Sequence, residues 1–579
     1  MKKRILIIAT VVLPLLYFFS ACNSGNSNES SAISTDSVTI ASGKVFFAKN
    51  CSGCHNFKQD GIGPQLSGIT TKVSAHWIRN FIKNPQQVIS SGDEHAQQLF
   101  KKYKAIMPSF ASVNADELNA VIAFLHTHKP FAQKAVKDYA KGLSNPIPDS
   151  IRLSNLVVNL KLFTQIPAST DSGKLPLTRI TKLDYQPNTG RIFINDLRGK
   201  LHQLQDNDKP VVYLDIAKLK PKFINEPGLA TGLGSFAFHP AFEKNGLFYT
   251  THTESPASGK ADFAYADSIE VILQWVLTEW KADKPNAEKF SDTSRELLRV
   301  NMVTGIHGIQ EITFNPNAKP GNEDYGLLYI GVGDGGSVEE GYPSLVHSQE
   351  KIWGTILRID PMGTNSANGR YGIPQHNPFV QSQNSKALGE IYALGFRNPH
   401  RITWSKSGKM LACNIGQSNI ETLNLIGPGN DYGWPIREGS FVLHPDGDLN
   451  NIYPLASNDS IYKITYPVAQ FDHDWGVSAI SGGFEYGGTA IPALKGKFLF
   501  GDIPTGKLFY VEMGDIKQGK QVAVKEWKIT KDNIPTSLKK LCGNDRADLH
   551  FGKDSKGELY ILTKTDGKVY KLVSAKNNQ

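Results

Sequence analysis

Two spacings of apolar residues divide the chain into an early helical part and a longer strand-rich part. In segments 76–82 and 116–126 apolar residues recur at the three- to four-residue spacing of an amphipathic helix. Beyond about residue 160 such patterns become few, and short apolar runs follow turns that contain glycine. The sequence therefore predicts a small all-α domain over residues 37–130, followed by an all-β domain over residues 160–575.

The strand-rich part repeats one unit six times. In each copy a turn with glycine leads into a short apolar strand, and the irregular spacing means that insertions separate the copies. A repeated strand unit is typical of a β-propeller, and six copies predict six blades. The copies begin at Gly190, Gly246, Gly326, Gly408, Gly496 and Gly557.

Polar residues follow several of these strands and are candidates for a site at one mouth of the propeller. They are Asp196, Asp334, Gln417 and Asp502. Loops from separate blades converge on the central axis, which makes the mouth a suitable place for a binding or catalytic site. Each of the aspartates could equally cap a turn, so both interpretations stay open.

The first 36 residues predict export and a lipid anchor. Residues 2–4 are basic, and the apolar run 5–19 is too short for an ordinary membrane span. Small residues directly before Cys22 resemble a bacterial lipoprotein cleavage site, so residues 1–21 are interpreted as a signal peptide and Cys22 as the lipidated N-terminus. The Ser- and Asn-rich segment 22–36 would be a flexible tether. We therefore expect a lipid-anchored protein on the periplasmic side of a bacterial membrane.

Composition and the distribution of charge argue against a nucleic-acid partner. The apolar fraction of 40% and the net charge of +9 are ordinary for a soluble globular protein of 579 residues. The basic residues are spread along the chain and form no clustered stripe, so we expect no nucleic-acid partner. Residues 131–159 are interpreted as a linker between the two domains.

The pentapeptide Cys51-Ser52-Gly53-Cys54-His55 predicts covalent attachment of haem c. The two cysteines bind the vinyl groups of the haem, and the adjacent histidine becomes an axial ligand of the iron. A zinc half-site or a redox dithiol would need a second CxxC or a βαβ pattern, and the sequence has neither. Met107, on the loop before the last predicted helix, is the expected sixth ligand, and His76 is the competing residue.

Domain 37–130 resembles the small class I cytochromes c throughout its length, with each expected element in order. Two cysteines remain outside the haem and lipid motifs, Cys413 and Cys542. In an oxidising compartment they could form a disulfide, or they could be buried and free.

Six motifs of the strand-rich part occur in a fixed order, at residues 234–240, 331–336, 354–360, 395–400, 430–435 and 482–486. Together they resemble the glucose/sorbosone dehydrogenase family, the soluble quinoprotein sugar dehydrogenases, over nearly the whole domain. The resemblance implies a six-bladed propeller that holds pyrroloquinoline quinone (PQQ) over the channel mouth. It also implies a Ca²⁺ ion that bridges the quinone and the protein.

The resemblance gives individual residues a role. His307 matches the base that removes the proton of the sugar hydroxyl group, a task for which an imidazole pKa near the operating pH is suited. Asp334 matches the carboxylate beside this base. Arg397 matches an arginine that contacts the quinone, and Asn398 follows it as in the family. All four are therefore expected at the catalytic site.

The remaining expected contacts are less complete. Gly416 and Gln417 match the pair whose backbone carbonyls bind calcium, a hard cation that prefers oxygen ligands. Arg546 alone stands for two quinone-facing arginines. The family's glutamine falls at Ala230, and the lysine that pairs with the quinone falls at Pro504. The resemblance thus implies the fold more firmly than the cofactor.

These features predict a lipid-anchored quinohaemoprotein dehydrogenase. It would oxidise an aldose or another polyhydroxy compound at the propeller mouth and pass the electrons to haem c. An external acceptor, in the respiratory chain or a soluble cytochrome, would then take them. The tethered haem provides a high local concentration of acceptor, which favours redox work. The alternative is a propeller without PQQ that binds carbohydrate or protein, fused to an electron-carrier cytochrome c.

Overall fold

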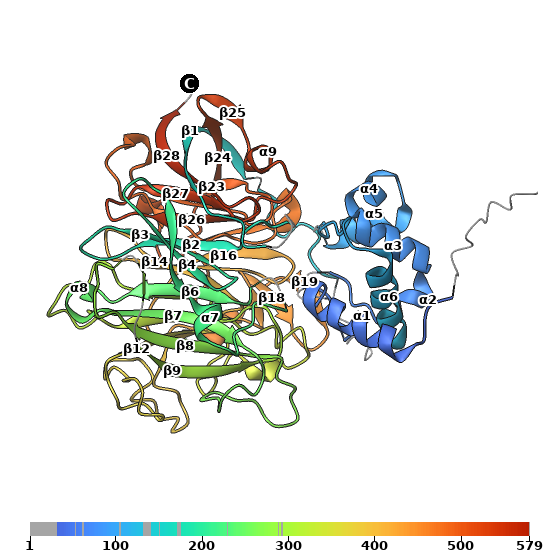
Figure 1. Cartoon of the computed structure of the whole chain (residues 1–579), viewed down its shortest axis with the longest axis horizontal. Coiled ribbons are helices and arrows are strands. Elements are labelled where there is room, and N and C mark those ends of the chain that lie inside the picture. Colours follow the sequence, from blue (N-terminus) through green and yellow to red (C-terminus); the bar gives the residue numbers. More distant parts are fainter. Residues whose placement is uncertain are drawn as a thin grey trace, which may run out of the picture.

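The computed structural model of the chain consists of a helical part beside a larger body of strands (Figure 1). It describes residues 32–577, apart from 53, 59, 61–62, 104–105, 131–140, 150, 171–174, 228–229, 288 and 291–292. The predicted signal peptide and Cys22 lie outside the described residues. The predicted fold class is confirmed, with a small helical cytochrome c part followed by an all-β propeller.

The helical part contains amphipathic helices at the two segments where the apolar spacing predicts them, 76–82 and 116–126. Asn114 accepts a hydrogen bond from the backbone N–H of Glu117, whose side chain bonds back to the Asn114 backbone, and this capping box starts the last helix. The third helix ends at Lys83, and its C-cap Asn84 directly precedes Pro85. The helices are α1 (Ser37–Asn50), α2 (Ile69–Lys72), α3 (Ala75–Lys83), α4 (Pro85–Ser90), α5 (Glu94–Tyr103) and α6 (Ala115–Thr127).

Helices α1 and α6 cross at a point where only glycine fits. A Cβ atom on Gly43 would lie 1.9 Å from the Ala120 carbonyl oxygen. Around this crossing a small core forms from Phe47 of α1 and from Val121 and Leu125 of α6. The crossing therefore holds the end of α1, and with it the Cys51–His55 motif, against the rest of the helical part.

Among the described residues the strand-rich part forms the six four-stranded blades of a propeller, and hydrogen bonds join the fifth, sixth and first blades into one sheet. Each of the six predicted glycine turns leads into the second strand of a blade. In the last blade this strand is β27, because that blade starts with β26. The blades are β2 (Ile180–Tyr185), β3 (Ile192–Asp196), β4 (Lys200–Leu204), β5 (Pro210–Asp215); β6 (Leu233–Phe238), β7 (Leu247–Glu254), β8 (Leu273–Lys281), β9 (Thr293–Met302); β10 (Glu311–Phe314), β11 (Leu328–Val332), β12 (Thr355–Ile359), β13 (Ile391–Leu394); β14 (Pro399–Trp404), β15 (Met410–Asn414), β16 (Ile420–Leu425), β20 (Ala469–Asp472); β21 (Phe484–Glu485), β22 (Lys497–Gly501), β23 (Leu508–Glu512), β24 (Lys525–Lys531); and β26 (Leu549–Lys553), β27 (Leu559–Thr563), β28 (Lys568–Asn577), β1 (Arg152–Gln165).

Short strands, short helices and 3₁₀ turns lie between or beside the strands of the blades. The fourth blade carries an inserted three-stranded sheet between β16 and β20, and β25 pairs with β24. These elements are β17 (Arg437–Glu438), β18 (Phe441–His444), β19 (Asp448–Tyr453), β25 (Ile534–Thr536), the helices α7 (Ile216–Leu219), α8 (Phe242–Asn245) and α9 (Leu538–Cys542), and the 3₁₀ turns Pro343–Leu345, Asp459–Tyr462, His473–Trp475, Pro492–Leu494 and Met513–Asp515.

Strand β1 closes the ring. It pairs antiparallel with the last strand, β28, from Leu156 opposite Asn577 to Gln165 opposite Lys568, and it also pairs with β24. Because β1 begins at Arg152, the propeller starts inside the segment 131–159 that we interpreted as a linker. Sequence pattern alone does not reveal this strand, because its partner is about 400 residues later in the chain.

Two open questions of the sequence are answered by the fold. Asp196 and Asp502 cap turns: Asp196 accepts the backbone N–H of Arg198 two residues later, and Asp502 accepts that of Thr505 three residues later. Cys413, buried in β15, and Cys542, in α9, are both free thiols and form no disulfide with each other.

We predict that Gly43→Ala destabilises the helical part by about 1–3 kcal/mol, because the added methyl group forces α1 away from α6. Thermal unfolding followed by the haem absorbance measures the change. Ser42→Ala, on the exposed face of the same helix, serves as the control and should leave the transition unchanged. An equal transition temperature for Gly43→Ala and the wild-type chain would contradict the tight crossing.

Candidate active site

His307 and Asp334 form a buried pair at the propeller mouth. The Nδ1 atom of His307 lies 2.8 Å from Oδ1 of Asp334, and both residues are almost fully buried. The second oxygen of Asp334 accepts the indole N–H of Trp434 at 3.0 Å, and its first also accepts the backbone N–H of Gly336. A carboxylate held in this way fixes the imidazole with the proton on Nδ1, which leaves Nε2 to accept a proton from a substrate.

The backbone at His307 adopts a conformation that is uncommon for residues other than glycine, with φ at +50°. Gly333 makes this geometry fit, because a Cβ atom there would lie 2.2 Å from the His307 carbonyl oxygen. The backbone N–H of Gly335 donates to the same carbonyl. The loop after β11 and the loop before β10 thus hold the histidine in place from both sides.

Arg397 joins this pair to the neighbouring blade. Its backbone carbonyl accepts the N–H of Asp334 at 2.8 Å, and its guanidinium is only 1% exposed. The guanidinium donates to Glu339 at 2.6 Å, to the Gln417 side chain at 2.8 Å and to the Gly416 carbonyl at 2.6 Å. Arg397 is therefore a rigid buried cation next to Asp334, and its partner Glu339 carried no signal in the sequence.

Asn398 lies next to Arg397 and faces the same region. Its side-chain amide contacts that of Gln310 at 3.5 Å, and its backbone carbonyl accepts the N–H of Ile415. The predicted residues His307, Asp334, Arg397 and Asn398 thus come together from the third and fourth blades.

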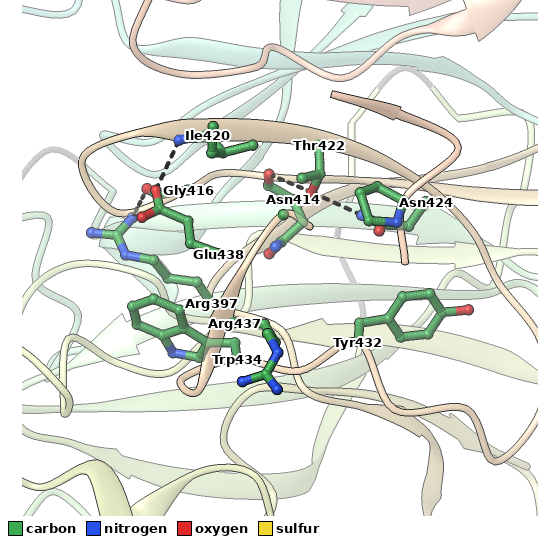
Figure 2. A pocket seen from close by; sticks show the side chains of 12 residues that line it. Arg397, Asn414, Gly416, Ile420, Thr422, Asn424, Tyr432, Trp434, Arg437 and Glu438 are labelled. Atoms are coloured by element: carbon green, nitrogen blue, oxygen red, sulfur yellow. Dashed lines mark hydrogen bonds between the residues drawn. The ribbon is translucent and has the colours of Figure 1, made fainter. Parts of the chain in front are cut away.

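The loop predicted to bind calcium is already occupied by a cation. Figure 2 shows the guanidinium of Arg397 directed at the Gly416 carbonyl, in the pocket beside it. Glu438 fixes this loop by accepting backbone N–H groups of Gln417 and Ile420 at 2.8 and 2.9 Å. A calcium ion at this carbonyl would meet a positive charge, so the described residues do not fit the metal, and no step below depends on it.

Buried polar atoms near His307 lack hydrogen-bond partners and are candidates to bind a polar ligand. Both ring nitrogens of His400 and Nδ1 of His550 are buried and lack a hydrogen-bond partner among the residues that the structure describes. The two rings are 5.6 Å apart, and His400 is close enough to His307 for the two to interact electrostatically. Burial lowers the pKa of His400 to about 3, so its ring is neutral. Such donor and acceptor atoms suit a planar quinone with carbonyl and carboxylate groups.

The motif predicted to attach haem is preformed. His55 Nδ1 lies 2.8 Å from the Pro64 carbonyl oxygen, which fixes the tautomer and leaves Nε2 for the iron. Met107 is half-buried on the loop before α6, whereas His76, the competing ligand, is exposed on α3 and contacts Asn80. The structure thus leaves the assignment of Met107 as a prediction and makes His76 a poor competitor.

The attachment loop is packed against the propeller mouth. The charges of Arg546 and Glu339 reach the Cys54 thiol and act on its pKa in opposite directions, while burial raises that pKa to about 11. Glu339 is the residue that binds Arg397. Cys54, and therefore any haem bound to it, lies beside the residues that surround His307. In Figure 1 the helical part correspondingly lies against the side of the propeller that carries β18 and β19.

Ion pairs hold the two domains together. Lys58, three residues after His55, contacts the Glu340 carboxylate at 3.4 Å and its carbonyl oxygen at 3.2 Å, and lies over the Tyr342 ring. Lys49 pairs with Glu226 at 3.0 Å. Since Glu340 follows Asp334 on one loop, the segment 334–342 touches both His307 and the loop that carries Cys54 and His55.

Comparison with known proteins agrees with this division. A model of the family Glucose / Sorbosone dehydrogenase matches residues 177–571, and a model of Cytochrome c matches residues 40–129. A solved structure titled "glucose dehydrogenase" aligns with a TM-score of 0.50 and 19% identity, over 71% of this chain and 98% of that one. At this identity the structural match shows the fold alone.

Three curated relatives illustrate how varied the family is. The HIPL1 protein of Arabidopsis thaliana is 24% identical over 59% of this chain and 53% of its own length. Hedgehog-interacting protein of Homo sapiens is 26% identical over 92% of this chain and 71% of its own. Quinoprotein glucose dehydrogenase B of Acinetobacter calcoaceticus is 25% identical over 42% and 47%. The chain spans about half the length of the first relatives that it matches.

We predict that Lys58→Glu separates the haem domain from the propeller, because it places two negative charges together at the interface. Both side chains are partly exposed, so the expected loss is about 1 kcal/mol, or roughly fivefold in the ratio of docked to separated molecules. Small-angle scattering measures this as a larger radius of gyration. The double variant Lys58→Glu/Glu340→Lys should restore the compact form, and Lys44→Glu, at an exposed position of α1, should not change it. A compact Lys58→Glu single variant would refute the ion pair's role.

Proposed function

Because the chain belongs to the glucose/sorbosone dehydrogenase family, we propose that it oxidises an aldose or related polyhydroxy compound with PQQ and passes the electrons to its own haem c. One observation carries this proposal: the segment 334–342 begins at the carboxylate that orients His307 and contains Glu340, which pairs with Lys58 of the haem-attachment loop. A catalytic pair and an electron exit are thus joined within nine residues.

His307 is the proposed base. With Nδ1 donating to Asp334, its Nε2 is the nitrogen that takes the proton of the substrate hydroxyl group. The buried Asp334 carboxylate then stabilises the imidazolium that forms, and the indole of Trp434 keeps this carboxylate oriented. The strained backbone at His307 and the absence of a side chain at Gly333 hold the ring in this position.

Arg397 and Asn398 orient the reactants beside this base. The Arg397 guanidinium is fixed by Glu339, Gln417 and the Gly416 carbonyl, so it provides a positive charge that does not need to reorganise during the reaction. When bound, PQQ supplies the acceptor for the hydride that leaves the substrate carbon, and haem c supplies one-electron steps towards an external acceptor.

The haem-attachment loop provides the exit path. Lys58 and Lys49 hold this loop on the propeller, and Cys54 lies near Arg546 and Glu339. His55, fixed by the Pro64 carbonyl, and Met107 are the proposed iron ligands. A fixed short separation makes electron transfer within one chain faster than transfer between chains.

We also propose that the protein is exported and anchored by lipid at Cys22, on the periplasmic side of a bacterial membrane. Haem c attachment on that side of the membrane agrees with the signal-like residues 1–21. Among the described residues no helix is long and apolar enough to cross a membrane.

A second candidate function is a propeller that binds a protein partner without PQQ. The alignment with human Hedgehog-interacting protein over 92% of this chain favours it, as do Ala230 and Pro504 at two expected quinone contacts. The paired geometry of His307 and Asp334 has no purpose in this alternative, so the enzyme remains the better-supported proposal.

Reconstitution separates the two candidates. The full-length haem protein is mixed with PQQ, with and without calcium, and aldoses or polyols are then added while the haem absorbance is followed. We expect haem reduction that requires both quinone and sugar. Addition of a calcium chelator tests whether the metal is needed. Because the Arg397 guanidinium already binds the Gly416 carbonyl, we expect haem reduction to continue in the presence of the chelator. Failure of every sugar and alcohol to reduce the haem would favour the binding protein.

His307→Ala and Asp334→Asn test the catalytic pair. We expect each to slow sugar-dependent haem reduction by roughly 10²–10⁴-fold, the first by removing the base and the second by allowing the wrong imidazole tautomer. The haem spectrum after reduction with dithionite should be unchanged in both. Asp515→Asn, at an exposed position of the propeller, is the matched control. Full activity of His307→Ala would exclude it as the base.

A further inference from the structure

Pro504 stands where the family resemblance places the lysine that pairs with the quinone, but a cation lies next to it in the fold. The Pro504 carbonyl accepts the backbone N–H of Ala547 at 3.0 Å, and the neighbouring Ile503 carbonyl accepts that of Leu549 at 2.8 Å. Arg546 directly precedes Ala547. The loop after β22 and the loop before β26 are therefore joined by backbone hydrogen bonds. Arg546 lies in the second of these loops, next to the bonds.

Two further loops bring cations to the same place. The backbone N–H of Lys564 donates to the Asp548 carbonyl at 3.2 Å, and the Thr565 hydroxyl donates to the Arg546 carbonyl at 2.7 Å. On the other side the Thr178 hydroxyl donates to the Lys564 carbonyl at 3.0 Å, next to Arg179. Hydrogen bonds between loops of the first, fifth and sixth blades thus gather Arg179, Arg546 and Lys564.

We call Arg179, Arg546 and Lys564 the cation cluster. Burial, together with the charges of Arg179 and Arg546, lowers the pKa of Lys564 to about 8, and Asp548 and Asp196 oppose this shift. Asp548 is paired with Arg546 at 2.7 Å, and Asp196 accepts the backbone N–H of Arg198 in the turn after β3. Three cations gathered in one largely buried place, beside only the two carboxylates of Asp548 and Asp196 among these groups, favour a bound anion.

Lys564 of the cation cluster is electrostatically close to two buried histidines, one of which is near His307. The charge of Lys564 reaches His400 and His550, and His400 in turn is close to His307. His400 is 4% exposed and both of its ring nitrogens lack a hydrogen-bond partner within the described chain. A buried polar side chain in this state is an independent sign of a ligand with hydrogen-bonding groups next to His400.

We propose that Lys564, supported by Arg179 and Arg546, binds carboxylate groups of the quinone and takes over the role of the lysine that is absent at Pro504. This inference rests on the function proposed above. An ammonium group and two guanidinium groups suit an aromatic polycarboxylate, because charge-assisted hydrogen bonds to carboxylate oxygens are the strong class. His400 and His550 provide polar contacts on the side towards His307.

Equilibrium dialysis of PQQ against the full-length haem protein, without any sugar, tests the inference. Lys564→Gln should weaken quinone binding about tenfold to hundredfold, since hydrogen bonds to charged groups contribute roughly 1.5–3 kcal/mol. Lys564→Arg should retain most of the affinity. Lys556→Gln removes a charge from the exposed turn of the same blade and should bind as the wild-type chain does. Unchanged affinity in Lys564→Gln would overturn the inference.

A change in the ligand provides the second test and does not depend on how well a variant folds. The trimethyl ester of PQQ lacks the carboxylate charges, so it should bind the wild-type chain weakly and should not respond to Lys564→Gln. Equal binding of the ester and the free acid would contradict the cation cluster's role. A raised KM only for acidic sugars, with quinone affinity intact, would assign the cluster to the substrate and overturn the inference. If the wild-type chain does not bind PQQ at all, the proposed function as a PQQ-dependent dehydrogenase is contradicted.

Discussion

Closure of the propeller ring by β1 and β28 is the contact on which the rest of the structure depends. The strand that follows the linker pairs with the last strand of the chain, so the first and sixth blades become neighbours. Only in a closed ring can loops around residues 178, 504, 546 and 564 meet, although they are up to almost 400 residues apart in the chain. The same strand brings the linker, and the haem domain before it, to the propeller.

The second constraint is that one short loop serves two tasks. Asp334 must orient His307, and Glu340 must receive Lys58 of the haem-attachment loop. Between them Glu339 holds Arg397 and places its charge near Cys54. A shift of this loop would therefore change the base, the buried guanidinium and the position of the haem together. This loop therefore links the position of the proposed base to the position of the haem, and no additional segment is needed for the link.

Local sequence signals predicted much of this arrangement. The helical spacing of residues 116–126, the glycine turns before the second strands and the Cys51–His55 motif each depend on residues close in the chain, and the structure places them as expected. The link between His307 and Asp334 came from family resemblance. By contrast, β1, the docking of Lys58 and the cation cluster depend on residues brought together by the ring, and no periodicity or spacing encodes such contacts.

The central claim is that electrons pass from the propeller site to the haem within one molecule. Stopped-flow absorbance of the haem, after quinone-loaded protein is mixed with saturating sugar, tests it most directly when protein concentration is varied over about a hundredfold range. The account predicts a first-order rate constant of haem reduction that is independent of protein concentration. A rate that rises in proportion to protein concentration would show transfer between molecules and would contradict it.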